Sequence, residues 1–166
     1  MTFADENYFS ELDAALSAIN EALEDNPLFS DVPVILDDDL NLENKVAQAL
    51  AVTGGVSVVI GVPELVNDHP NVPGPLFGEA KIALAVQECP AVNRAGGTRK
   101  PARRIAEEAA RTLHHRKISD VGKTLVVESI SAADVDEKTG TVTFAVVLAT
   151  GGISLRTIKP PNHQTT

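Results

Sequence analysis

The residues that could carry out chemistry are few, and their spacing seldom suits a reaction. Gly96-Gly97-Thr98-Arg99-Lys100 resembles part of a phosphate-binding loop, but that loop needs GxxxxGK followed by Ser or Thr, placed between a strand and a helix. Here Pro101 follows Lys100 directly. A turn leading into a helix is the favoured interpretation, and a single structural anion at the helix start is the alternative.

A second cluster of oxygen-bearing side chains lies between residues 37 and 43. Its members alternate as the ligands of a calcium-binding loop do: Asp37, Asp39, Asn41 and Glu43. An EF-hand also needs Gly at its sixth loop position and Glu at its twelfth. Leu42 and Gln48 occupy those positions. The pattern therefore favours a solvated acidic turn, with a weak cation site as the alternative.

Histidine and cysteine do not form a recognisable site. His114 and His115 are adjacent, so on a helix they point about 100° apart and chelate one metal poorly. Cys89 is the only cysteine, which excludes an intramolecular disulfide. It ends an apolar run before Pro90, as a half-buried structural thiol would. GxSxG and HExxH are also absent. We predict no catalytic residue, no cofactor and no metal.

Charge is distributed unevenly along the 166 residues, whose formal net charge is −9. Residues 1–44 hold 12 acids and not one Lys or Arg, whereas residues 94–117 hold eight of the 14 basic residues and two acids. Such polarity suits association with charged neighbours, including copies of the same chain. The alternative is that the acids serve only solubility.

Apolar periodicity predicts three helices, over residues 7–24, 42–52 and 101–115. We expect Asp5 or Asn7 to cap the first helix. The Gly54-Gly55 pair ends the second, and Pro101 suits the first turn of the third. In the third helix, four residues mark the buried side: Ile105, Ala109, Thr112 and Leu113.

Five segments have the composition of strands: residues 32–36, 56–60, 77–89, 125–130 and 141–149. Pro33 restricts the first to a sheet edge. Alternation in the third places Ile82, Leu84 and Val86 on one face. The last two strands flank residues 136–140, whose composition predicts a C-terminal β-hairpin. Residues 63–75 hold four prolines and read as a long loop or partly extended arm.

These elements predict an α+β fold with a mixed, mainly antiparallel sheet, helices packed on one face and a C-terminal β-hairpin. The length suits a single domain, expected over residues 1–157, followed by a polar, flexible tail over residues 158–166. The N-terminus lacks the features of a signal peptide, and no segment resembles a membrane helix. With 4% aromatic residues, few rings are available to stack on nucleic-acid bases.

The third predicted helix and the turn before it carry most of the basic side chains, which could contact nucleic-acid phosphates. However, Arg103 and Arg104 stand four residues before Glu107 and Glu108, and Glu107 stands four before Arg111. Such i,i+4 pairs are typical of a helix that faces solvent or protein. Recognition of DNA would also favour an overall basic charge. We therefore favour protein contact and keep a nucleic-acid-associated adaptor as the alternative.

The order of the elements has a parallel among known proteins. An N-terminal helix leads into the segment Val32-Pro-Val-Ile-Leu36, and a proline-rich break precedes an alternating strand. The helix over residues 102–113 follows, and residues 135–147 then combine an acidic turn, Thr-Gly and a β-rich strand. Over residues 8–150 this order resembles the tail terminator, or tail completion, proteins of tailed bacteriophages and related prophage-derived particles. The acidic insert at residues 37–44, with its extra helix, departs from the family pattern. So does the lack of Trp or Tyr in the last strand.

The resemblance implies a non-enzymatic structural subunit of a virion tail, assembled in the bacterial host cytoplasm. Such subunits form a homo-oligomeric ring, commonly a hexamer, that stops growth of the tail tube and meets the neck. The partners would be other copies, the tail tube protein and the head–tail connector protein, without a membrane or specific nucleic acid. A small enzyme of another kind is the remaining alternative. The predicted interface regions are the proline-rich segment 63–75, the turn 93–100 with the basic helix, and the turn 134–140. The predicted interface residues are Arg99, Lys100, Arg103, Arg104, Arg111, Asp37, Asp38, Asp39, Asp136 and Glu137.

Overall fold

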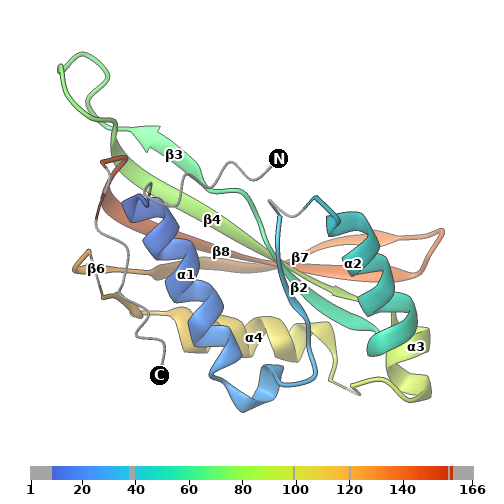
Figure 1. The fold of residues 1–166 in the computed structure, drawn as a ribbon. Helices are drawn as coiled ribbons and strands as arrows, with labels where there is room; N and C mark the ends of the chain where they lie inside the picture. The colour runs from blue at the N-terminus through green and yellow to red at the C-terminus, as the bar shows by residue number, and fades with distance from the viewer. Residues whose placement is uncertain (1–8, 38–39, 99, 120, 157, 159–166) are drawn as a thin grey trace.

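The computed structural model describes residues 9–37, 40–98, 100–119, 121–156 and 158. Their main feature is a six-stranded sheet with the order β1-β2-β4-β8-β7, in which β3 also pairs with β4 (Figure 1). Only the β1–β2 pair is parallel within this sheet. The strands are β1 (Val34–Leu36), β2 (Val56–Ile60), β3 (Glu64–Asn67), β4 (Phe77–Glu88), β7 (Val126–Asp136) and β8 (Thr141–Ser154). A short separate ladder joins β5 (Lys117–Ile118) to β6 (Lys123–Thr124).

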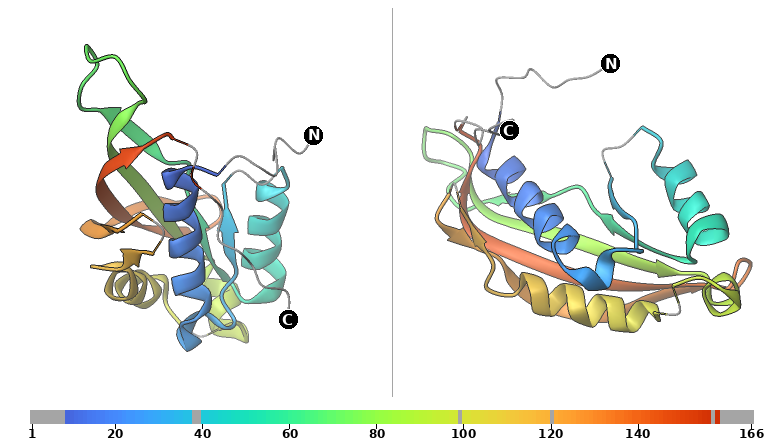
Figure 2. Two further views of the ribbon diagram at one scale, coloured as in Figure 1. Left: turned by 60° about the vertical axis from the view of Figure 1, so that its left-hand side comes forward. Right: turned by 60° about the horizontal axis from the view of Figure 1, so that its bottom comes forward.

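Helices complete the α+β fold that the sequence predicts. They are α1 (Glu11–Glu24), α2 (Leu42–Gln48), α3 (Pro90–Ala95) and α4 (Ala102–Leu113), with a 3-10 turn η1 (Pro27–Phe29) and a π-helical turn η2 (Ala49–Thr53). Both α1 and α4 pack against β8 and against each other, whereas α2 and η2 contact β1 and β2 at the opposite edge of the sheet (Figures 1 and 2). Within the described part of the chain, every helix is too short or too polar to span a bilayer.

The core lies between the sheet and the α1–α4 layer. Ile82, Leu84 and Val86 of β4 are fully buried there, which confirms the predicted alternation. Helix α4 contributes Ile105 and Leu113 to the same core. Burying one such aliphatic side chain contributes about 1.5–3 kcal/mol to folding. The other side of β4 remains partly exposed from Glu79 to Gln87, so the two faces of the strand differ as the sequence predicts.

Helix α1 begins later than predicted. Ser10 is its N-cap: the Ser10 Oγ accepts a hydrogen bond from the Asp13 N–H at 3.2 Å, and the Asp13 carboxylate accepts one from the Ser10 N–H at 2.7 Å. This reciprocal capping box satisfies two N–H groups that have no partner within the helix. The prediction that Asp5 or Asn7 caps the helix is therefore wrong. Residues 1–8 lie outside the described part of the chain.

Several short elements were missed in the sequence, and β3 and α3 are the longest of them. The segment read as a long loop or arm contains β3, which pairs with residues 78–81 of β4, while β2 pairs with residues 84–88 of the same strand. Strands β2 and β3 therefore lie along one side of β4 as a single strand interrupted at residues 61–63. The segment read as a turn at residues 93–98 begins inside α3, where Pro90 occupies the first turn. In both cases four to six residues were too few for periodicity to reveal the element.

The C-terminal hairpin is confirmed, and both of its strands are longer than predicted. β7 and β8 remain paired from Val126 opposite Ala149 to Asp136 opposite Thr141, with register shifts at residues 127–129 and 132–134. Helix α4 contacts β7, β8 and β4, yet Ile130 and Val135 of β7 remain 44% and 58% exposed. The outer strand therefore carries apolar side chains that α4 covers incompletely. Of the predicted C-terminal tail, the structure describes only Ile158, whose N–H donates to the Phe9 carbonyl at 2.7 Å.

Candidate assembly surfaces

His114 and Cys89 have structural positions. His114 lies at the end of α4, and its Nδ1 accepts a hydrogen bond from the Val127 N–H at 3.1 Å, so it links the helix to β7. Cys89 is half-buried where β4 leads into α3. Among the described residues, no three His, Cys, Asp or Glu side chains gather as a metal site would require. The surfaces of the molecule therefore become the candidates for function.

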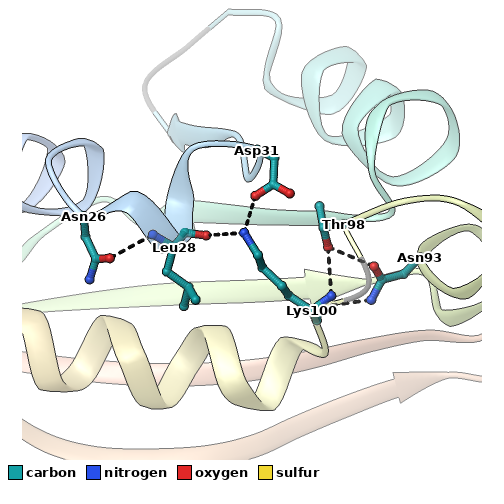
Figure 3. A network of polar contacts seen from close by, with 6 residues as sticks. All are labelled: Asn26, Leu28, Asp31, Asn93, Thr98 and Lys100. Carbon is teal, nitrogen blue, oxygen red and sulfur yellow. Dashed lines mark hydrogen bonds and ion pairs between the residues drawn. The ribbon is translucent and has the colours of Figure 1, made fainter.

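A polar network joins the segment before α4 to the acidic N-terminal part of the chain (Figure 3). The Lys100 ammonium donates to the Leu28 carbonyl at 2.9 Å and to the Asp31 carboxylate at 2.5 Å. The Lys100 carbonyl accepts from the Asn93 amide at 3.0 Å, and the Asn93 amide oxygen accepts from the Thr98 hydroxyl at 2.9 Å. Lys100 stays a predicted interface residue. Its ammonium is already bound within its own chain, and its side chain is 25% exposed.

Glu88 anchors the N-terminus of α4 at the same place. One of its carboxylate oxygens accepts from the Ala102 N–H at 2.8 Å, and the other accepts from the Asn93 amide at 2.8 Å. A negative charge at a helix N-terminus is stabilised by the helix dipole and by N–H groups that have no helical partner. Glu88 itself is only 8% exposed. This buried contact fixes where the basic helix begins relative to β4.

The basic face of α4 consists of Arg103, Arg104 and Arg111, three of the predicted interface residues. The side chains of Arg103 and Arg111 are about three-quarters exposed. Arg103 pairs with Glu107 at 2.8 Å, as predicted from their spacing. Arg111 pairs with Glu108 at 2.5 Å and not with Glu107, because residues three apart are also neighbours on a helix. The basic face is thus partly neutralised by its own acids.

A shallow groove lies between α4 and β7, beside this basic face. Val127 and Ile130 supply apolar side chains from the strand, and Ala110 supplies one from the helix. The remaining lining residues are Glu107, Arg111 and His114. Because Val135 follows on the same face of β7 and is 58% exposed, the apolar strip continues toward the hairpin tip. We call this surface the α4–β7 groove.

The second surface is the β3–β4 arm, defined as residues 62–77. Figures 1 and 2 show its loop projecting beyond the end of the sheet, away from α4. Five of its large apolar side chains are exposed: Val62, Val66, Val72, Leu76 and Phe77. The His69 ring stacks on the Phe77 ring, with centroids 6.5 Å apart and planes 5° from parallel. The arm contains the acids Glu64 and Asp68 and no Lys or Arg, so its surface is apolar and acidic.

Asp136 and Glu137, also predicted interface residues, lie at the tip of the β7–β8 hairpin. The Asp136 carboxylate accepts from the Lys138 N–H at 2.9 Å and from the Thr139 hydroxyl at 2.8 Å. The Lys138 N–H contributes most to holding the pKa of Asp136 below its ordinary value of 3.8. Because the folded pKa is lowered, the stabilisation is present above that ordinary value and is lost as the pH falls through the lowered one.

Of the remaining predicted interface residues, the structure describes Asp37, which lies on neither of these surfaces. Asp37 is exposed after β1, where its N–H donates to the Ile60 carbonyl at 2.9 Å. Arg99, Asp38 and Asp39 lie outside the described residues. Strand alternation does place Glu88 on the buried face with Val86, so its role could have been inferred from the sequence. The sequence also predicted the proline-rich segment 63–75 as an interface region, and the arm contains that segment; the pairing of β3 with β4 at its base was not predicted.

The fold is similar to that of a chain in a solved virion structure. A chain in the virion of a native gene transfer agent particle aligns with a TM-score of 0.55 and 13% sequence identity, covering 92% of this chain and 99% of that one. A mycobacterial sensor histidine kinase aligns over 87% and 98% of the two chains with 12% identity, but its TM-score of 0.27 supports no argument. No protein-family model and no curated protein sequence matches the chain. The chain therefore shares its fold with a chain of a gene transfer agent virion.

Proposed function

We propose that this protein is a structural subunit of a phage-like virion, and that it forms a ring which caps the tail tube and joins it to the head or neck. The observation that carries this proposal is the alignment with a chain of a gene transfer agent virion, which covers nearly all of both chains. An overlap of that extent involves the whole architecture and not one common motif. The resemblance of the sequence to tail terminator proteins supports the more specific role.

The surfaces of the molecule support an assembly role. Large exposed apolar side chains that lie together commonly mark a site of protein contact. Among the residues that the structure describes, ten large hydrophobic side chains are exposed; half of them belong to the β3–β4 arm, and Ile130 and Val135 line or continue the α4–β7 groove. A subunit with two such surfaces can bind a neighbour on each side, as a ring requires.

The basic face of α4 gives less support to a nucleic-acid adaptor. Two of its three arginines, Arg103 and Arg111, already pair with glutamates on the same helix. A phosphate contact would have to compete with those pairs. Binding to DNA is nevertheless simple to measure, and it is expected to be strongest at low salt.

The proposal is tested on the purified full-length chain and on tail tubes from particles that lack it. We expect light scattering after size-exclusion chromatography to give one closed oligomer, with six copies the state implied by the resemblance. Electron microscopy should show it at one end of the tubes. A protein that stays monomeric at high concentration and leaves tube ends bare would contradict the proposal. Retention on DNA at about 50 mM salt, without ring formation, would instead favour the adaptor.

A further inference from the structure

The β3–β4 arm and the α4–β7 groove differ in charge but share an apolar character. The arm exposes Val72, Leu76 and Phe77, with Glu64 and Asp68 as its charged side chains. The groove exposes Ile130 of β7, and its charged lining residues are Arg111 and Glu107 of α4. Helix α4 carries three arginines and two glutamates, so the apolar and acidic arm has, on the same chain, an apolar depression beside a helix of net positive charge. Complementary potentials of this kind favour one specific pairing of surfaces.

The arm and the groove of one molecule lie apart. All three ribbon views show the arm loop projecting past one end of the sheet, apart from α4, and β4 and β8 lie between β3 and β7 in the strand order (Figures 1 and 2). The loop is also tied at its base, where the Asp68 N–H donates to the Phe77 carbonyl at 3.0 Å. The groove is therefore placed to receive the arm of another molecule.

We infer that the β3–β4 arm of one copy docks into the α4–β7 groove of the next copy. This inference rests on the proposed ring and specifies its subunit contact. Two arms meeting each other would bring Glu64 and Asp68 close to their own counterparts, and two grooves would do the same with Arg111. Like charges repel at such contacts, so the unlike pair is favoured. An arm-to-groove contact uses a different surface on each partner, and such a contact forms a ring when the rotation between neighbouring copies closes.

A cross-linking experiment tests the contact directly. Val72→Cys and Ile130→Cys are combined in a Cys89→Ser chain and treated with a short bis-maleimide. We expect a ladder of covalent multimers that ends at the ring size. When chains with only one of the two cysteines are mixed, we expect heterodimers and no longer species. A Val72→Cys, Leu40→Cys chain is the matched control, because Leu40 is 90% exposed and lies on neither surface. That chain should give no ladder.

Charged substitutions test whether the apolar side chains drive the contact. Val72→Asp and Ile130→Asp, made separately, should each raise the dissociation constant of the oligomer by at least about tenfold, as burial at an interface core would predict. Leu40→Asp should leave it unchanged. All three positions are exposed in the single chain, so the circular dichroism spectrum and melting temperature should stay close to those of the parent.

The outcomes separate this inference from the proposed function. A ring that forms normally with Val72→Asp and gives no Val72–Ile130 cross-link would overturn the arm-to-groove contact and leave the ring in place. Cross-linking of the Val72→Cys chain to itself would likewise overturn it, in favour of contact between arms. A parent protein that forms no oligomer, alone or on tail tubes, would contradict both the arm-to-groove contact and the proposed ring.

Discussion

A single buried carboxylate, that of Glu11, joins the two ends of the described chain. The Glu11 side chain is 3% exposed; one oxygen accepts from the Ser154 N–H at 2.8 Å and the other from Arg156 Nε at 3.0 Å. The first contact spans 143 residues of sequence. It attaches the first turn of α1 to the end of β8, so the carboxylate fixes how that helix lies on the sheet.

We expect Glu11→Ala to lower the free energy of unfolding by about 1–3 kcal/mol, because the buried Ser154 N–H would lose its acceptor. Urea denaturation of the two proteins measures the difference. Glu21→Ala is the control, since Glu21 is an exposed glutamate on the same helix and its removal should cost no more than about 0.5 kcal/mol. Equal losses in the two variants would show that the Glu11 contacts are unimportant.

Single residues differ in how far the sequence reveals their roles. Glu88 follows Ile82, Leu84 and Val86 in strict alternation, so its place on the buried face could be read directly from the chain. Glu11 has no comparable signal, because its partners lie at the other end of the sequence. The two glutamates have similar burial, and only one could be found by pattern.

At the scale of elements, the attachment of β3 to β4 decides the position of the arm. The backbone of β3 passes so close to Gly78 that a Cβ at this position would lie 1.7 Å from the Val66 carbonyl oxygen. Real Cβ atoms do not approach a backbone oxygen so closely, and neither strand can yield without loss of pairing. The glycine is therefore required for β3 to lie where it does.

We expect Gly78→Ala to displace β3 and to cost about 1–3 kcal/mol of unfolding free energy, as overpacking does elsewhere. Hydrogen exchange should show faster exchange of the amide of Asp68, which donates to Phe77 at the base of the arm. In Gly151→Ala, the new Cβ would meet nothing within 4 Å, so stability should change little. If Gly78→Ala left the Asp68 amide fully protected, this account of β3 would be wrong.

The longer elements were predictable because burial follows their periodicity. Helices α1 and α4 and strands β2 and β4 lie within a few residues of the predicted bounds. Strand β7 runs six residues past the predicted end, over Ser131, Ala132 and Asp134, which have little intrinsic preference for strands. Pairing with β8 determines the conformation there, and one strand's sequence does not contain that information.

At the scale of the whole molecule, an arm-to-groove contact would combine apolar burial with charge attraction. We expect the dissociation constant of the oligomer to rise as salt increases from about 50 to 500 mM, because exposed charges are screened at high ionic strength. Asp68→Asn should weaken the oligomer at low salt and reduce the salt dependence. Asp25→Asn, an exposed change outside the arm, should do neither. Sedimentation velocity at several salt concentrations measures the dissociation constant of the oligomer for the parent protein and for the two variants.

The uneven charge of the sequence predicted a subunit with unlike surfaces and pointed to the acidic N-terminal part and the basic third helix. Part of the attraction expected between the acidic N-terminal part and the basic segment acts within one chain, because Lys100 pairs with Asp31 of the same chain. The acidic surface of the inferred contact comes instead from Glu64 and Asp68, in a segment where proline was the main signal. Charge counts describe a stretch of sequence, whereas a surface is assembled by the fold from separate stretches.

The β3–β4 arm also has a consequence for how such a particle could evolve. None of its residues belongs to the hydrophobic core or packs against it. Substitutions in the loop between residues 68 and 76 are therefore expected to cost little folding stability, and under the inferred contact each would alter the surface that meets the next copy. Substitution of a few exposed arm residues could therefore change the binding partner during evolution while the core of the fold stays the same.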